Sequence, residues 1–378
     1  MSNLTKECFR VRVSCMTYNH AKYIQDAMNG FCMQQTGFPF ICTVFDDNST
    51  DGEQDVIRKY LDNNFIMNDD TIKMTKETDD YTLIYTRHKT NANCFFAVYF
   101  LKYNHYQLKK SRDPYLLQEW KDTKYIALCE GDDYWTDPLK LQKQVYFLEK
   151  HPDYTMVCNR TQLLSERQKT FIGENYCYIH DRKVKTKDII YRSGLFISTC
   201  SIVFRKDIQE NYPYYCIKCA VGDYPLQIMA AMRGNVYYFN DIMSVYRIQN
   251  SNSWMASQKW HSADEKNLRR IDSMINMYKG FSFDYPKYKK IFNNKIAQYL
   301  ISQSPYRFTQ SDKDLNLYLQ YYKKEYKQFP LFWKFVNILR MNNIPILRGF
   351  YKTYTDPLFM RFKKKVYIYY KNTQQHRI

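Results

Sequence analysis

The first 250 residues of the chain alternate between strand-like and helix-like apolar spacing, and this alternation restricts the fold more than any other feature. Strand patterns occupy residues 11–15, 41–45, 83–85 and 125–129. Helical spacing is found at residues 23–31, 56–61 and 141–148. Strands that alternate with helices favour an α/β fold with a mixed, mainly parallel sheet flanked by helices.

Acidic residues follow two of the predicted strands directly. Asp46 and Asp47 end the second strand, and Glu130, Asp132 and Asp133 follow the strand at residues 125–129. Ligands of open α/β sheets bind beyond the carboxyl ends of the strands. We therefore expect these two acidic clusters, which lie about 80 residues apart in sequence, to meet at one edge of one sheet.

Several kinds of site compete for these acidic clusters. Asp47, Ser49 and Asp51 imitate the start of a calcium loop, but Arg58 stands where such a loop needs a bidentate Glu. No glycine-rich phosphate loop occurs in the chain, so phosphates would have to be held through a metal ion. Hard oxygen ligands at Asp132 and Asp133, after the strand at residues 125–129, suit Mg²⁺ or Mn²⁺. Turn and helix capping is the alternative for either cluster alone.

Four short motifs occur in order along this part of the chain: residues 13–19 (VSCMTYN), 34–36 (QQT), 46–51 (DDNSTD) and 131–135 (GDDYW). Their order and spacing resemble those of family 2 glycosyltransferases with the GT-A fold. The similarity covers roughly residues 8–255. It implies the fold of nucleotide-diphospho-sugar transferases.

The resemblance also implies which residues bind the nucleotide of the donor. Thr17, Tyr18 and Asn19 match the first loop, which lies around the nucleotide. Asp47 matches an aspartate that contacts the base.

Further matches concern the diphosphate and a metal ion. Asp132 and Asp133 match a DxD-type motif that contacts the ribose and holds the metal. Arg247 matches a late motif near the diphosphate. Two positions of these motifs depart from the family pattern, since Glu130 replaces a common Asp and Gln249 replaces a common His, and a third departure lies at Gly222.

The resemblance assigns Asp223 as the general base that deprotonates the acceptor hydroxyl, although Gly222 replaces a common Glu before it. The alternative is that Asp223 caps a short helix that closes at Gly234. Tyr134 and Trp135 follow the metal motif, and we expect a stacking role against a donor or acceptor sugar. Core packing is the alternative for Trp135.

Two further local patterns carry weaker expectations. Thr50 and Glu53 have the spacing of a capping box, which predicts a helix that begins there. Cys216 and Cys219 have CxxC spacing, but no second close pair accompanies them, so we expect reduced thiols rather than a zinc site.

Basic charge is concentrated in the last quarter of the sequence. Residues 280–378 hold 19 Lys and Arg against 5 Asp and Glu, whereas the rest of the chain holds 37 against 33. Residues 331–340 have amphipathic spacing, and a lysine- and tyrosine-rich segment follows Tyr351. Such a region suits an anionic lipid surface, or helices that pack on the preceding domain. We expect a catalytic domain at residues 1–255 and a helical extension at 256–378.

The resemblance, together with the two acidic clusters, implies an inverting, metal-dependent glycosyltransferase that uses a nucleotide sugar, with a UDP-linked sugar as the expected donor. The expected acceptor is a saccharide or lipid-linked saccharide of envelope polysaccharide synthesis. No apolar run is long enough to span a bilayer, and no signal core is seen, so we expect a cytoplasmic protein at the inner face of the membrane. The alternative is a non-enzymatic binder of RNA or another polyanion through the basic region.

Overall fold

The computed structural model describes residues 8–249, 265–302 and 331. The chain divides into two compact units. The first unit comprises residues 1–184, 197–210 and 233–253, and the second comprises residues 185–196, 211–232 and 254–378. The predicted division after residue 255 stays a prediction. The predicted amphipathic helix at 331–340 and the segment after Tyr351 lie outside the described residues, apart from Leu331.

The first unit is built on a twelve-stranded mixed sheet with the order β10-β12-β8-β11-β6-β1-β2-β5-β4-β3, in which β7 pairs with β12 and β9 pairs with β8. The strands are β1 (Val11–Thr17), β2 (Phe40–Asp46), β3 (Met74–Glu77), β4 (Tyr81–Arg87), β5 (Cys94–Leu101), β6 (Tyr125–Leu128), β7 (Tyr134–Trp135), β8 (Tyr154–Ser165), β9 (Thr170–Asn175), β10 (Arg182–Val184), β11 (Val203–Arg205) and β12 (Asn235–Ile248).

Four neighbouring strands, β6, β1, β2 and β5, run parallel at the centre of the sheet. In this arrangement Thr17 at the end of β1 is level with Asp46 at the end of β2. The carboxyl ends of β1, β2 and β6 therefore lie at the same edge, as the alternation of strands and helices predicts. Strands β3, β4 and β11 pair antiparallel with their neighbours, which makes the sheet mixed.

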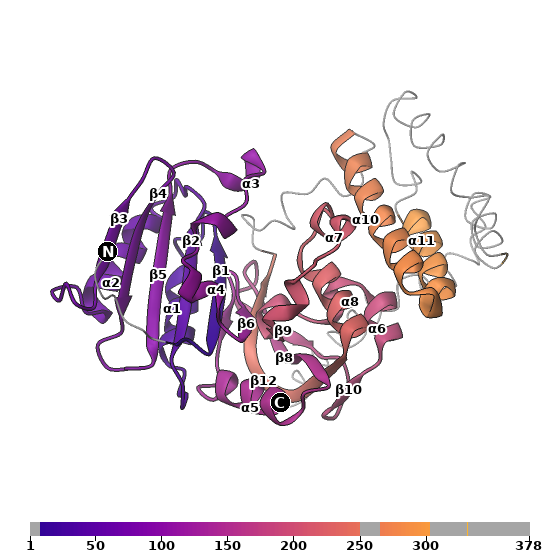
Figure 1. Ribbon diagram of the computed structural model, residues 1–378, viewed down its shortest axis with the longest axis horizontal. Coiled ribbons are helices and arrows are strands. Elements are labelled where there is room, and N and C mark those ends of the chain that lie inside the picture. Colours follow the sequence, from indigo (N-terminus) through magenta and orange to yellow (C-terminus); the bar gives the residue numbers. More distant parts are fainter. Residues whose placement is uncertain (1–7, 250–264, 303–330, 332–378) are drawn as a thin grey trace, which may run out of the picture. The chain divides into compact units, whose positions relative to one another are not determined.

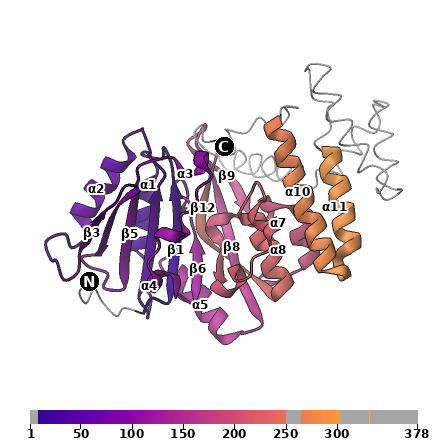
Figure 2. The same ribbon diagram turned by 45° about the horizontal axis from the view of Figure 1, so that its top comes forward.

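The central strands are buried on both faces. One face is covered by α1 (Ile24–Cys32), α2 (Glu53–Asn64) and α5 (Lys140–Lys150), whose apolar residues join the strands in one large core. The other face packs a second core around Trp120 of α4 (Gln118–Lys121), beside η1 (Asp113–Tyr115). Figures 1 and 2 show α1 and α2 beside the parallel strands.

The described residues of the second unit are mainly helical. It contains α6 (Thr186–Arg192), η2 (Gly194–Phe196), α7 (Tyr214–Ile217), α8 (Asp223–Arg233), α10 (Glu265–Asp284), η5 (Pro286–Tyr288) and α11 (Lys289–Ser302). Its core is rich in rings, and Phe281 of α10 stacks on Phe292 of α11 with a centroid distance of 5.7 Å. Three further short helices, α3 (His105–Leu108), η3 (Thr199–Ser201) and η4 (Lys206–Gln209), belong to the first unit.

Several local predictions can be compared with this structure. The strand and helix patterns coincide with β1, α1, β2, α2, β4, β6 and α5. Helix α2 begins at Glu53, as predicted, but the predicted capping box is absent, because Gly52 is the N-cap with a φ of 87° and makes no side-chain hydrogen bond. All eleven cysteines are free in the structure. No helix within the described ranges is both long and apolar enough to cross a membrane.

Candidate functional site

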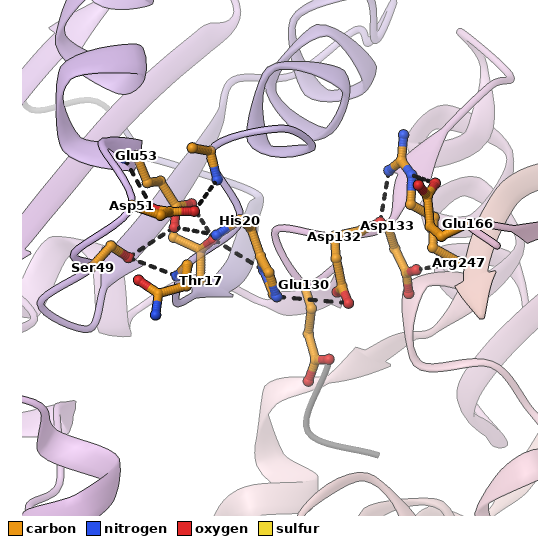
Figure 3. Close-up of polar contacts among 12 residues, drawn as sticks. Thr17, His20, Ser49, Asp51, Glu53, Glu130, Asp132, Asp133, Glu166 and Arg247 are labelled. Atoms are coloured by element: carbon orange, nitrogen blue, oxygen red, sulfur yellow. Dashed lines mark hydrogen bonds and ion pairs between the residues drawn. The ribbon is translucent and has the colours of Figure 1, made fainter. Parts of the chain in front are cut away.

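The two acidic clusters lie together at the edge where β1, β2 and β6 end. The amide of Asp47 donates to the Thr17 carbonyl at 2.9 Å, and the amide of Gly131 donates to the Met16 carbonyl at 2.9 Å. The loops after β2 and β6 thus both run against the end of β1, and Figure 3 shows their side chains around one region. This is the convergence that the sequence predicts.

Gly131 is needed for this close approach. A Cβ at this position would lie 2.1 Å from Oγ1 of Thr17, which is far inside van der Waals contact. The next residue, Asp132, is nearly buried, and its Oδ2 lies 3.8 Å from Nε2 of His20. Burial lowers the pKa of His20, although Asp132 opposes this effect. The close packing of Gly131 therefore places the Asp132 carboxylate against the first loop.

Asp133 points in a different direction from Asp132. Its Oδ1 accepts the backbone N–H of Arg247 at 2.8 Å, and the Cys200 thiol is a further hydrogen-bonding neighbour of the buried carboxylate. Burial, together with the neighbouring charge of Asp132, raises the pKa of Asp133 well above its usual range. Asp133 thus ties the turn after β6 to strand β12, and its predicted role as a metal ligand stays a prediction.

Glu130 takes the place of a common Asp in the metal motif, whereas the predicted metal ligands are Asp132 and Asp133. Its side chain is exposed, and Figure 3 shows it projecting from the same turn as Asp132 and Asp133. Within the described ranges, no three His, Cys, Asp or Glu side chains form a group that could hold a metal ion alone. A Mg²⁺ ion shared with a diphosphate needs only one or two protein carboxylates, so Glu130 and Asp132 suit such an ion.

The side chain of Arg247 is buried, and its guanidinium contacts neighbouring groups of the protein. Its guanidinium donates to the Asp132 carbonyl at 2.7 Å and to Glu166 at 3.0 Å, and it also forms an ion pair with Asp26. The guanidinium carbon lies 4.9 Å from the ring centroid of Tyr23 and 4.7 Å from that of Tyr134. These contacts hold the turn that carries Asp132, so Arg247 stabilises the position of the acidic cluster.

The carboxylate of Asp47 also binds groups of the protein itself. Its two carboxylate oxygens accept the backbone N–H groups of His105 at 2.8 Å and Tyr106 at 3.0 Å, at the start of α3. Asp47 therefore holds the segment after β5 at the edge of the site. Its predicted contact with a nucleotide base would use the remaining lone pairs of the same carboxylate.

Arg112, which the sequence analysis missed, is a cation beside these acidic groups. Burial lowers the pKa of its guanidinium, and the charges that oppose this effect belong to Asp47, Asp113 and Glu130. The residue precedes η1, in a stretch with several other basic residues, and no spacing or motif distinguishes it from them. Only the fold brings Arg112 close to the acidic cluster.

The predicted first loop lies on this edge as well. Thr17 is buried, whereas Tyr18 is 36% exposed and is available to a ligand. Asn19 has a φ of 57°, a left-handed conformation that asparagine tolerates better than most residues. Its Oδ1 accepts the Thr50 amide at 2.8 Å, so Asn19 joins the loops after β1 and β2.

The two predicted stacking residues differ in exposure. Tyr134 is half-buried and packs on Arg247. Trp135 is only 1% exposed, its indole N–H donates to the Cys200 carbonyl at 2.8 Å, and its ring packs edge-on against Phe31. Trp135 is therefore a core residue in this structure, which was the alternative to a stacking role.

Asp223 belongs to the second unit, at the first position of α8. Its Oδ1 accepts the Tyr224 amide at 2.8 Å. A Cβ on Gly194 would lie 3.5 Å from Oδ2 of Asp223, so the turn after α6 adjoins the carboxylate. Lys295 of α11 holds that turn by donating to the Tyr191 carbonyl at 2.9 Å and the Ser193 hydroxyl at 2.6 Å.

No family model matches the chain. The uncharacterized proteins Rv1520 of Mycobacterium tuberculosis and Mb1547 of Mycobacterium bovis are each 26% identical to it over 270 residues. These residues are 70% of this chain and 68% of each relative. Such similarity without a characterised activity does not establish a function.

Among solved structures, that of S. aureus TarS 1-349 matches with a TM-score of 0.54 and 12% identity, covering 85% of this chain and 81% of TarS 1-349. The chain has a GT-A-like fold. The mannosyltransferase PcManGT from Pyrobaculum calidifontis, in complex with GDP-Man and Mn²⁺, matches with a TM-score of 0.47 and 14% identity. This match covers 95% of this chain and 86% of PcManGT. Its TM-score is too low for it to support the fold assignment.

Proposed function

We propose that this protein is an inverting glycosyltransferase that takes a sugar from a UDP-linked donor. The observation that carries the proposal is the convergence of the first loop, Asp47 and the Gly131–Asp132 turn at one edge of a GT-A-like sheet. Acidic side chains at such an edge repel a diphosphate unless a cation lies between them. A polyanion binder without a metal would leave this arrangement unexplained, so we favour the enzyme.

The donor would lie across the ends of β1, β2 and β6. In this proposal Thr17, Tyr18 and Asn19 line the nucleotide, and Asp47 contacts the base. Asp132, with the exposed Glu130, supplies the hard oxygens that would hold Mg²⁺ or Mn²⁺. When bound, the cation would neutralise the charge that develops on the leaving diphosphate. Arg247 keeps the Asp132 turn in place through the Asp132 carbonyl.

Asp223 is the proposed general base. It would take the proton from the acceptor hydroxyl while that oxygen attacks the anomeric carbon from the side opposite the diphosphate, which inverts the centre. Asp223 is the first residue of α8, so its carboxylate lies at the N-terminus of that helix.

The acceptor in this proposal is a saccharide or lipid-linked saccharide of envelope polysaccharide synthesis. The support is the basic, aromatic composition of residues 280–378, which suits attachment to an anionic membrane surface. The protein would then work at the inner face of the cell membrane, where lipid-linked saccharides are available.

A panel of nucleotide sugars tests the donor. Binding to the native state raises the melting temperature, so the true donor should give the largest shift in the presence of Mn²⁺. Transfer from that donor to a saccharide acceptor should then be lost in Asp223→Asn, while the shift with donor is retained. Retained turnover in this variant would exclude Asp223 as the base, and the absence of a shift with any nucleotide sugar would contradict the proposed function.

A further inference from the structure

Glu53 forms an unusual set of contacts next to the candidate site. It is the first residue of α2, and its side chain is fully buried. Its carboxylate accepts hydrogen bonds from the Thr17 hydroxyl, from the His20 backbone N–H at 2.8 Å and from the Ser49 hydroxyl at 2.8 Å. A capping-box Glu would bond back to its own helix, whereas Glu53 reaches across to the loop after β1.

A second set of hydrogen bonds surrounds this carboxylate. The Asn19 amide donates to the Ser49 hydroxyl oxygen at 2.9 Å, and the Ala21 amide donates to Asp51 at 3.0 Å. Together with the bonds of Glu53, they join residues 17–21 to residues 49–53 through backbone and side-chain groups. Glu53 lies at the centre of this junction, because it binds side chains or amides from both loops.

The junction continues to the acidic cluster. The His20 ring lies between two groups, with Nδ1 3.4 Å from Oγ1 of Thr17 and Nε2 3.8 Å from Oδ2 of Asp132. Gly131 packs directly on the Thr17 side chain. The positions of Thr17 and His20, which Glu53 fixes, therefore set the surface against which Asp132 lies. Figure 3 shows this chain of contacts from Glu53 to Asp132.

We propose that Glu53 is a positioning residue, which holds the first loop in the shape that a nucleotide requires and keeps His20 against Asp132. Glu53 has no exposed surface, so it acts through Thr17, His20 and Ser49 rather than by touching a ligand. That the ordered loop receives a nucleotide rests on the proposed function. The order that Glu53 imposes on the loop does not depend on it.

The loop order is tested by hydrogen–deuterium exchange of the full-length chain without ligand. In Glu53→Gln an amide group replaces one acceptor oxygen and faces donors, so the amides of residues 19–21 should exchange about tenfold faster. Asp55→Asn is the matched control, because Asp55 is exposed on the same first turn of α2, and it should exchange as wild type does. Unchanged protection of residues 19–21 in Glu53→Gln would overturn the proposal.

If Glu53→Gln does not fold, Ser49→Ala removes one donor to Glu53, together with the acceptor of the Asn19 amide. Asn19 therefore loses protection in any case, and the test is read at residues 20–21, which should loosen to a smaller degree than in Glu53→Gln, since the bonds of Glu53 to Thr17 and His20 remain. Protection of residues 20–21 equal to that of wild type in this variant would then count against the proposal.

Binding of UDP with Mn²⁺, measured by titration calorimetry where circular dichroism shows folded protein, tests the link to the site. Glu53→Gln should bind about tenfold more weakly than wild type, and Asp55→Asn should bind equally well. A purely structural Glu53 would lower the melting temperature without changing this affinity, which would overturn the positioning role. If wild type itself binds no UDP, the proposed donor is contradicted, and the exchange measurement still decides whether Glu53 orders the loop.

Discussion

At the scale of single residues, Glu53 is notable because its titratable side chain is fully buried. Burial raises the pKa of Glu53 to about 7, although hydrogen bonds from Thr17, His20 and Ser49 oppose the shift. Between the ordinary pKa of 4.5 and about 7, the folded state therefore holds this proton more tightly than the unfolded state. The contribution of Glu53 to stability must fall as the pH rises through this window.

The first prediction follows from this decrease of stability with rising pH. Urea unfolding of wild type should give a free energy of unfolding that decreases from pH 5 to pH 8 relative to Glu53→Gln, by up to about 3 kcal/mol. The glutamine variant lacks the titrating group and serves as the reference at each pH. An equal pH dependence in the two proteins would show that Glu53 does not titrate in this range.

Gly131→Ala is the second prediction. The new Cβ would collide with Oγ1 of Thr17, and the backbone would have to move, which we expect to cost about 2 kcal/mol of folding free energy and to disturb Asp132. Gly37→Ala is the control, because its Cβ would meet only the Gln142 side chain, at 3.8 Å. Thermal unfolding of both variants measures the difference, and equal melting temperatures would contradict the close packing of Gly131.

At the scale of elements, the strands and helices around the site could largely be predicted from apolar spacing, since β1, β2 and β6 are short apolar runs that end in turns. Strand β5 was missed, although its continuous apolar sequence, residues 94–101, is typical of a strand buried on both faces. The inward direction of Asp133 and the role of Glu53 could not be predicted. Both depend on distant partners, Arg247 and Thr17, which only tertiary packing brings close.

The third prediction concerns the contact between α6 and α11. Lys295 is buried, and burial lowers its pKa to about 7, yet it donates to Tyr191, Ser193 and Gln298. Lys295→Met leaves these acceptors without a donor, so we expect a loss of about 2 kcal/mol in chemical unfolding. Lys290→Met, an exposed position on the same helix, should have little effect. If the two variants are equally stable, the free energy gained by no longer burying the Lys295 amine equals the free energy lost with its hydrogen bonds. That result would contradict the prediction.

At the scale of the whole molecule, the uneven charge predicts attachment to anionic lipid. Full-length protein should sediment with vesicles that contain phosphatidylglycerol, and the binding should weaken as salt screens the lysines. The truncation for comparison ends after residue 302, because α11 belongs to the folded second unit. Equal sedimentation of the truncated and full-length chains would remove the membrane role from the C-terminal residues.

The central claim is that the acidic strand ends bind a nucleotide diphosphate through a divalent cation, and calorimetry of UDP binding tests it most directly. Wild type should bind UDP much more tightly with Mn²⁺ than with a chelator, because Asp132 alone repels the diphosphate. In Asp132→Asn this dependence on Mn²⁺ should largely disappear. UDP binding that is equally tight with Mn²⁺ and with chelator in wild type, or that is unchanged in Asp132→Asn, would contradict the account.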